Sequence, residues 1–180
     1  MEIIKDPQEV KRFAKQREDE NQDFRAWIKG HGPDDDELNA LVQKLSDEVW
    51  AKIDCALCAN CCRVTNTNAV PDEFASLAQA LNMSIQEFKD KVLRFDHQEK
   101  SWILPCPCPL LDGNLCRVYD DRPLQCRDYP NLDANFRSHS LSRIANAEIC
   151  PIVFNVIEAL KHELRWPGLK RWRERARPRR

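Results

Sequence analysis

Four cysteines lie within eight residues of this chain, as Cys55, Cys58, Cys61 and Cys62, and no other feature has clearer chemistry. Thiols at this density are typical ligands of a soft metal such as zinc or iron, whereas an ordinary core does not need them. All nine cysteines lie between positions 55 and 150, the other five being Cys106, Cys108, Cys116, Cys126 and Cys150. We therefore expect one central segment to build a metal site.

The start of the chain indicates the compartment. Charged side chains make up 11 of the first 20 residues, so this stretch does not resemble a signal peptide, and no later stretch is apolar enough to cross a membrane. We therefore expect a cytoplasmic protein without membrane contact. In a reducing compartment, clustered cysteines favour metal binding or catalysis over disulfides.

Charge is distributed unevenly along the chain although its net value is −1. Residues 165–180 carry eight basic side chains and one acidic side chain, and Trp166 and Trp172 in this tail could stack on bases. The tail therefore leaves a nucleic-acid-binding module as one hypothesis, although such an end is more often simply solvated. The sequence has no Walker loop, dinucleotide-binding glycine pattern, HExxH or GxSxG motif.

Helices are predicted on both sides of the cysteines. The pattern predicts a helix from Pro7 to about Ile28, and an amphipathic helix that begins at the acidic residues 34–36 and reaches Trp50. Further helices are predicted after Pro71, after the capping box at Ser84, around 141–147 and from 151 to 164. Residues 95–125 are rich in turn signals, with a tight turn predicted at Asp112-Gly113 between short extended segments.

The local conformation of residues 55–62 decides which thiols can share a metal. In a continuous helix Cys55, Cys58 and Cys62 would lie on one face, with Cys61 further round. In a loop, the C-x2-C spacing is a chelating turn of zinc and iron–sulfur sites. In both cases the adjacent side chains of Cys61 and Cys62 diverge, so downstream thiols must complete the site.

The downstream motifs add a family resemblance. The CxxCxxCC cluster is followed by CPLL, GNLCRVY and DDRPLQCRDYP, with the insert PDEFASLAQALNMSIQEF between the cysteine segments. In this order, over residues 53–150, the motifs resemble the YkgJ-type cysteine-cluster proteins, a zinc- or iron-chelating family. The resemblance implies metal ligands at Cys55, Cys58, Cys61, Cys62, Cys108, Cys116, Cys126 and Cys150, with Cys106 as the spare thiol. In this chain Ala59 stands where a glycine is common in the family, and Asn60 could supply a left-handed residue there.

These observations predict a mainly α fold with short irregular or β segments, built as a small metal-stabilised domain with helical extensions. We expect a helical N-terminal extension over 1–52, the cysteine-cluster domain over 53–150, and a C-terminal helix with a basic tail over 151–180. One or two centres would hold Zn2+ or iron, including an iron–sulfur cluster as an alternative. The expected function is a metal-stabilised binding or regulatory domain with a protein partner; the alternatives are an iron–sulfur enzyme or electron-transfer component and the nucleic-acid-binding module. Whether the protein is an enzyme stays open.

Overall fold

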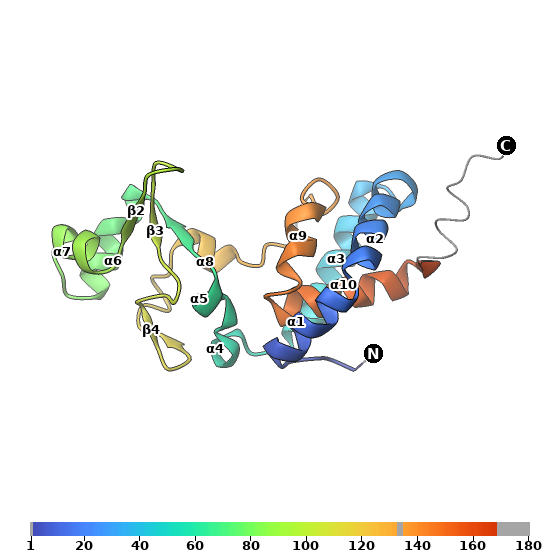
Figure 1. The fold of residues 1–180 in the computed structure, drawn as a ribbon, viewed down its shortest axis with the longest axis horizontal. Coiled ribbons are helices and arrows are strands. Elements are labelled where there is room, and N and C mark those ends of the chain that lie inside the picture. Colours follow the sequence, from blue (N-terminus) through green and yellow to red (C-terminus); the bar gives the residue numbers. More distant parts are fainter. Residues whose placement is uncertain (1, 133–134, 169–180) are drawn as a thin grey trace. The chain divides into compact units, whose positions relative to one another are not determined.

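The structure, a computed structural model, describes residues 2–132 and 135–168 (Figure 1). Its mainly helical fold, with short strands in the cysteine-rich region, confirms the predicted fold class. Packing divides the chain into two units. We call Cys55–Tyr129 the cysteine unit, and the described parts of residues 1–54 and 130–180 the helical unit. The domain limits predicted from the sequence differ from these packing limits and stay a prediction.

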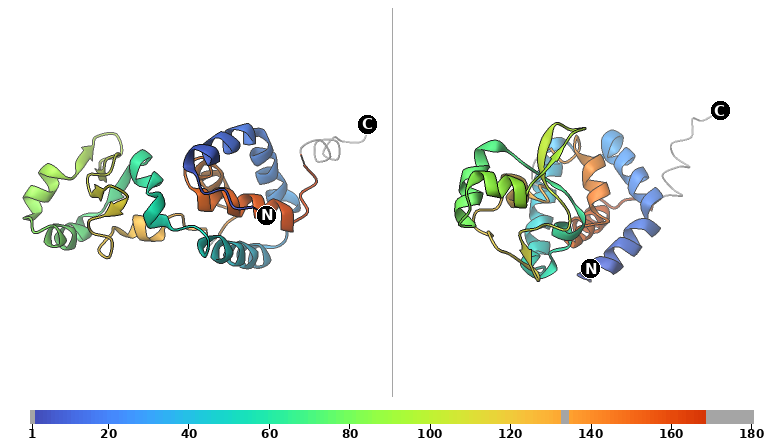
Figure 2. Two further views of the ribbon diagram at one scale, coloured as in Figure 1. Left: turned by 90° about the horizontal axis from the view of Figure 1, so that it is seen from below. Right: turned by 60° about the vertical axis from the view of Figure 1, so that its left-hand side comes forward.

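The helical unit consists of helices that pack around α10, and Figures 1 and 2 show them side by side. Its described helices are α1 (Pro7–Gln16), α2 (Glu18–His31), α3 (Asp35–Trp50), α9 (Ser140–Asn146) and α10 (Pro151–Glu163). Helix α3 begins as predicted, because the Asp34 carboxylate accepts a hydrogen bond of 2.9 Å from the Glu37 amide. The preceding helix α2 ends at His31, three residues beyond the predicted end at Ile28.

The prediction of one continuous helix from Pro7 to Ile28 is wrong, because the chain turns at Arg17 between α1 and α2. The Arg17 amide closes α1 by donating to the Phe13 and Ala14 carbonyls, and its guanidinium pairs with Glu158 on α10. The turn lets the apolar faces of α1 and α2 both reach the core. This explains why their combined apolar pattern is only loosely periodic.

Helix α10 supplies much of the core of the helical unit. It buries nine of its 13 residues, including Phe154, Ile157 and Leu160. A helix that is apolar on most sides is typical of an element surrounded by others. The buried ammonium of Lys161 lies 2.8 Å from both Glu20 and Glu158, so its charge is compensated within the unit.

The cysteine unit is built from shorter elements. In chain order these are α4 (Cys55–Cys58), α5 (Asn60–Val64), β1 (Thr67–Ala69), η1 (Pro71–Glu73), α6 (Phe74–Ala80), α7 (Ile85–Lys91), β2 (Arg94–Asp96), β3 (Ser101–Leu104), β4 (Leu111–Asp112), β5 (Leu115–Cys116) and α8 (Leu124–Asp128). Strands β1, β3 and β2 form an antiparallel sheet with β3 in the centre, and β4 and β5 form a hairpin.

The helices after Pro71 and Ser84 pack with the sheet to form the core of the cysteine unit. The capping box predicted at Ser84 is confirmed, since Ser84 and Glu87 exchange side-chain-to-backbone hydrogen bonds. The core cluster includes Phe74, Leu77, Phe88 and Leu104. Cys108 and Cys116 pack against this cluster from its edge, so part of the predicted site rests on the apolar core.

The tight turn predicted at Asp112-Gly113 is also present, between β4 and β5. Gly113 adopts a φ of 59°, a left-handed conformation that glycine accommodates readily. The turn places Asn114 and Cys116 at the end of the hairpin. Within residues 2–132 and 135–168, no helix combines the length and the apolar character needed to span a membrane.

Candidate metal centre

The first cysteine cluster is divided by a left-handed residue. Ala59 has a φ of 48° and separates α4 from α5, so the continuous helix considered for residues 55–62 is not formed. Asn60, suggested from the sequence as the left-handed residue, instead begins α5. Ala59 thus takes the turn itself, at the position where the family commonly has glycine. The single-face arrangement of Cys55, Cys58 and Cys62 therefore does not apply.

A segment from Cys58 to Asn68, which we call the anchoring segment, holds the downstream cysteines in place. The Cys62 carbonyl accepts a hydrogen bond of 2.7 Å from the Cys108 amide, and the Asn66 side chain accepts one of 2.8 Å from the Cys106 amide. The Cys126 thiol lies 3.8 Å from the Thr67 hydroxyl. Segments far apart in the chain are thus brought together around α5 and β1.

The charge of Cys62 influences the ionisation of three other thiols of the cysteine unit. Burial raises the pKa of Cys108 and of Cys116, and the charge of Cys62 raises both further. Burial also raises the pKa of Cys126 to about 11, with further contributions from the charges of Cys62, Cys108 and Cys116; the hydrogen bond with Thr67 acts in the opposite direction. Because the charge of Cys62 acts on all three, we group Cys62, Cys108, Cys116 and Cys126 as the central thiols of the unit.

Cys62 differs from the other central thiols because its pKa is lowered to about 6. The largest cause is the hydrogen bond from Cys61, whose sulfur lies 4.0 Å from the Cys62 sulfur; the Arg63 and Arg122 cations add to it, and burial opposes it. At neutral pH Cys62 is therefore a thiolate beside protonated thiols.

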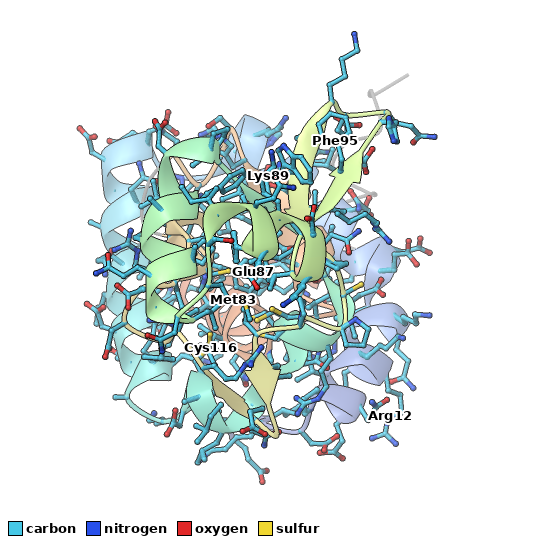
Figure 3. All side chains as sticks on the ribbon, turned by 90° about the vertical axis from the view of Figure 1, so that its left-hand side faces the viewer. Arg12, Met83, Glu87, Lys89, Phe95 and Cys116 are labelled. Atoms are coloured by element: carbon cyan, nitrogen blue, oxygen red, sulfur yellow. The ribbon has the colours of Figure 1, made fainter. Side chains whose placement is uncertain are left out.

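The other predicted ligands of the cysteine unit lie on α4 and at its junction with α5. Cys55 and Cys58 are half-buried on α4, which packs beside β5, the strand that carries Cys116. Cys61 is half-buried next to Cys62. The Cys116 and Met83 side chains, both labelled in Figure 3, each pack against the apolar core cluster.

Cys150 and Cys106 are not among the central thiols. Cys150 belongs to the helical unit, where it is 7% exposed and precedes α10, with its amide donating to the Asn146 carbonyl over 2.9 Å. The predicted ligand set is thus divided between two units, and the place of Cys150 in it stays a prediction. Cys106, the predicted spare, is an exposed thiol.

The cysteine sulfur atoms are suitable ligands for a soft metal, but in the described part of the chain they are not gathered closely enough for three of them to share one ion. Among the residues that the structure describes, no three His, Cys, Asp or Glu side chains are placed so that they could hold a metal ion. None of the nine cysteines forms a disulfide. The sulfur atoms would have to move toward one another to share an ion, and they are chemically suited to zinc or iron when deprotonated.

Two arginines, Arg63 and Arg122, supply positive charge near the thiols. Arg122 and Arg127 lie on either side of Cys126 in the sequence, but the pKa of Cys126 is raised, chiefly by burial. The Arg122 guanidinium stacks 3.5 Å from the centre of the Tyr119 ring, and its charge lowers the pKa of Cys62 and Cys116. Sequence reasoning did not identify Arg63, although its position directly after the cysteine pair is a usable signal.

Comparison with known protein families identifies the family of this chain. Residues 54–151 match the CxxCxxCC family, described as "Putative zinc- or iron-chelating domain". The match covers more than half of the chain, so this protein belongs to the CxxCxxCC family. It confirms the resemblance drawn from the cysteine motifs. No curated protein and no solved structure matches the chain significantly.

Proposed function

We propose that the cysteine unit binds zinc or iron through thiolates, with Cys62, Cys108, Cys116 and Cys126 as the principal ligands. The observation that carries this proposal is the hydrogen bond that holds Cys108 against Cys62 beside the apolar core on which Cys108 and Cys116 pack, together with the effect of the Cys62 charge on the pKa of Cys108, Cys116 and Cys126. Cys55, Cys58 and Cys61 are proposed as additional ligands or as part of a second centre. Cys150 stays a candidate ligand on the resemblance alone.

Because its pKa is low, Cys62 is expected to bind the metal ion before the other thiols do. Cys62 attracts the cation as a thiolate, and the neighbouring thiols lose their protons as the positive charge comes close. A bound ion would neutralise the thiolates and cross-link segments that are otherwise joined by hydrogen bonds. We therefore expect metal binding to stabilise the fold of the cysteine unit.

The biochemical role that we infer is a metal-stabilised binding or regulatory domain with a protein partner. The surplus of thiols in the cysteine unit over the four of one zinc site keeps an iron–sulfur electron-transfer component or enzyme as the second candidate. Nucleic-acid binding has less support. Trp166 packs against Phe24 and Trp27 at centroid distances of 5.6 Å, and Trp172 lies outside the described residues.

Metal analysis of anaerobically purified protein, together with its absorption spectrum, tests the proposal. We expect at least one equivalent of zinc or iron per chain. Adding zinc to metal-free protein at pH 7 should release about three protons from a four-thiolate site, because only Cys62 is already ionised. A broad visible band that bleaches in air would favour iron–sulfur over zinc. Protein that purifies without metal and takes up none under reducing conditions would reject the proposal.

A further inference from the structure

Arg63 connects two cysteine-bearing elements that are distant in the sequence. Its guanidinium donates to the Cys58 carbonyl over 3.2 Å and to the Gly113 carbonyl over 2.8 Å, and it also contacts the Asn114 side-chain oxygen. The Asn114 amide in turn donates to the Leu57 carbonyl over 2.7 Å. Two side chains thus join the end of α4 to the β4–β5 turn.

The need for these contacts follows from the shortness of α4. The last carbonyls of a helix lack partners within the helix, and in a helix of four residues these are all of its carbonyls. The Ala59 amide reaches back to the Cys55 carbonyl over 3.1 Å, and the left-handed turn at Ala59 then ends the helix. The carbonyls of Leu57 and Cys58 receive their hydrogen bonds from Asn114 and Arg63.

We propose that Arg63 and Asn114 are positioning residues of the metal site, which hold Cys55 and Cys58 on α4 against the hairpin that carries Cys116. This inference rests on the proposed metal-binding function and adds two residues that are not ligands. The planar guanidinium suits the role because it donates to several acceptors in a fixed geometry, which a lysine ammonium does not reproduce. Outer partners of this kind, acting through the ligands, typically change metal affinity 10- to 100-fold.

The test compares zinc affinities of the full-length protein by chelator competition. Arg63→Met and Asn114→Ala should each weaken zinc binding roughly 10- to 100-fold, and Arg63→Lys should retain only part of the affinity. The double variant should lose little more than the single variants, because the two residues act through one shared contact. Arg94→Met, the same change on β2 of the same unit, is the control and should keep the wild-type affinity.

A spectroscopic measurement separates positioning from general destabilisation. Cobalt bound in place of zinc should show weaker thiolate-to-metal absorption per ion in Arg63→Met than in wild type or Arg94→Met, because fewer thiolates reach the ion. Affinities within twofold of wild type in both Arg63→Met and Asn114→Ala would overturn the proposal. So would losses that add independently in the double variant. If Arg63→Met does not fold, the exposed Asn114 still provides the test.

A metal-free measurement keeps this inference distinct from the proposed function. In metal-free protein, hydrogen exchange at the Ala59 amide should be faster in Arg63→Met than in wild type, because α4 loses its anchor. Wild-type protein that binds no metal would reject the proposed function. Unchanged exchange at Ala59 would reject the anchoring of α4, whatever the metal result.

Discussion

The two units of this protein obtain their order from different sources. In the helical unit, α10 is buried along most of its length and packs with α3 and α9, so hydrophobic burial accounts for the fold. In the cysteine unit, α4 and α5 have only four and five residues. Side-chain hydrogen bonds, one of them with the Cys126 thiol, connect segments that are distant in the sequence. Helices this short are not stable alone. From this comparison we expect metal binding to stabilise mainly the cysteine unit.

The largest expected effect is the loss of a central thiol. Cys126→Ser should sharply reduce metal content and unfold the cysteine unit, since apparent binding energies of structural zinc sites are on the order of 10 kcal/mol. Cys106→Ser, at the exposed spare thiol, is the matched control and should change neither metal content nor melting temperature. The measurements are metal stoichiometry and thermal unfolding. Equal losses in both variants would show that Cys106 is also a ligand.

A core substitution in the helical unit should lower the stability of the protein without lowering its metal content. Phe154→Ala on α10 removes a fully buried ring, so we expect about 3–5 kcal/mol loss in the free energy of unfolding. Metal stoichiometry of the folded protein should stay at the wild-type value. Denaturant unfolding and metal analysis of the same sample provide the check. A fall in metal content at denaturant concentrations where the protein is still folded would mean that the units are not independent in this respect.

The ionisation of the thiols predicts how metal-free protein responds to pH. The pKa of Cys126 is raised in the fold from 9.0 to about 11, so its stabilising contribution is complete below pH 9 and is lost as pH rises toward 11. The pKa of Cys62 is lowered in the fold from 9.0 to about 6, so its stabilising contribution is complete above pH 9 and is lost as pH falls toward 6. The stability of the metal-free cysteine unit should therefore decline toward both pH 6 and pH 11. Chemical denaturation of chelator-treated protein between pH 6 and 11 measures this, and Cys126→Ala should reduce the alkaline decline, to which Cys108 and Cys116 also contribute a part.

The smallest expected effect concerns the left-handed residue of the cysteine cluster. Ala59→Gly relieves a strain of about 1–2 kcal/mol but raises the entropy of the unfolded chain, which leaves a gain of about 0.5–1 kcal/mol. Asn60→Gly, at the first residue of α5, should not stabilise the protein. Denaturant midpoints of the metal-bound variants decide between them. A gain at position 60 and none at 59 would contradict the observed turn.

The two units also differ in how much of them the sequence predicts. Long amphipathic helices such as α3, the capping box at Ser84 and the turn at Gly113 follow from local rules, and they are present where expected. The break at Arg17 depends on a partner 141 residues away, Glu158, which no local pattern reveals. The candidate metal site has features of both kinds, some predictable from local sequence and others dependent on distant residues. Cysteine spacing and the family resemblance indicated the thiols, but the anchoring contacts of Arg63 join residues about 50 positions apart.

Hydrogen exchange of the full-length protein, measured by mass spectrometry with metal bound and after chelation, tests the central claim most directly. We expect chelation to increase exchange across Cys55–Tyr129, above all at the Cys108 amide, which donates to the Cys62 carbonyl. Amides of α3 and α10 should exchange at the same rate in both states. Exchange that is unchanged in the cysteine unit, or that increases equally in both units, would contradict the view that metal completes one unit only.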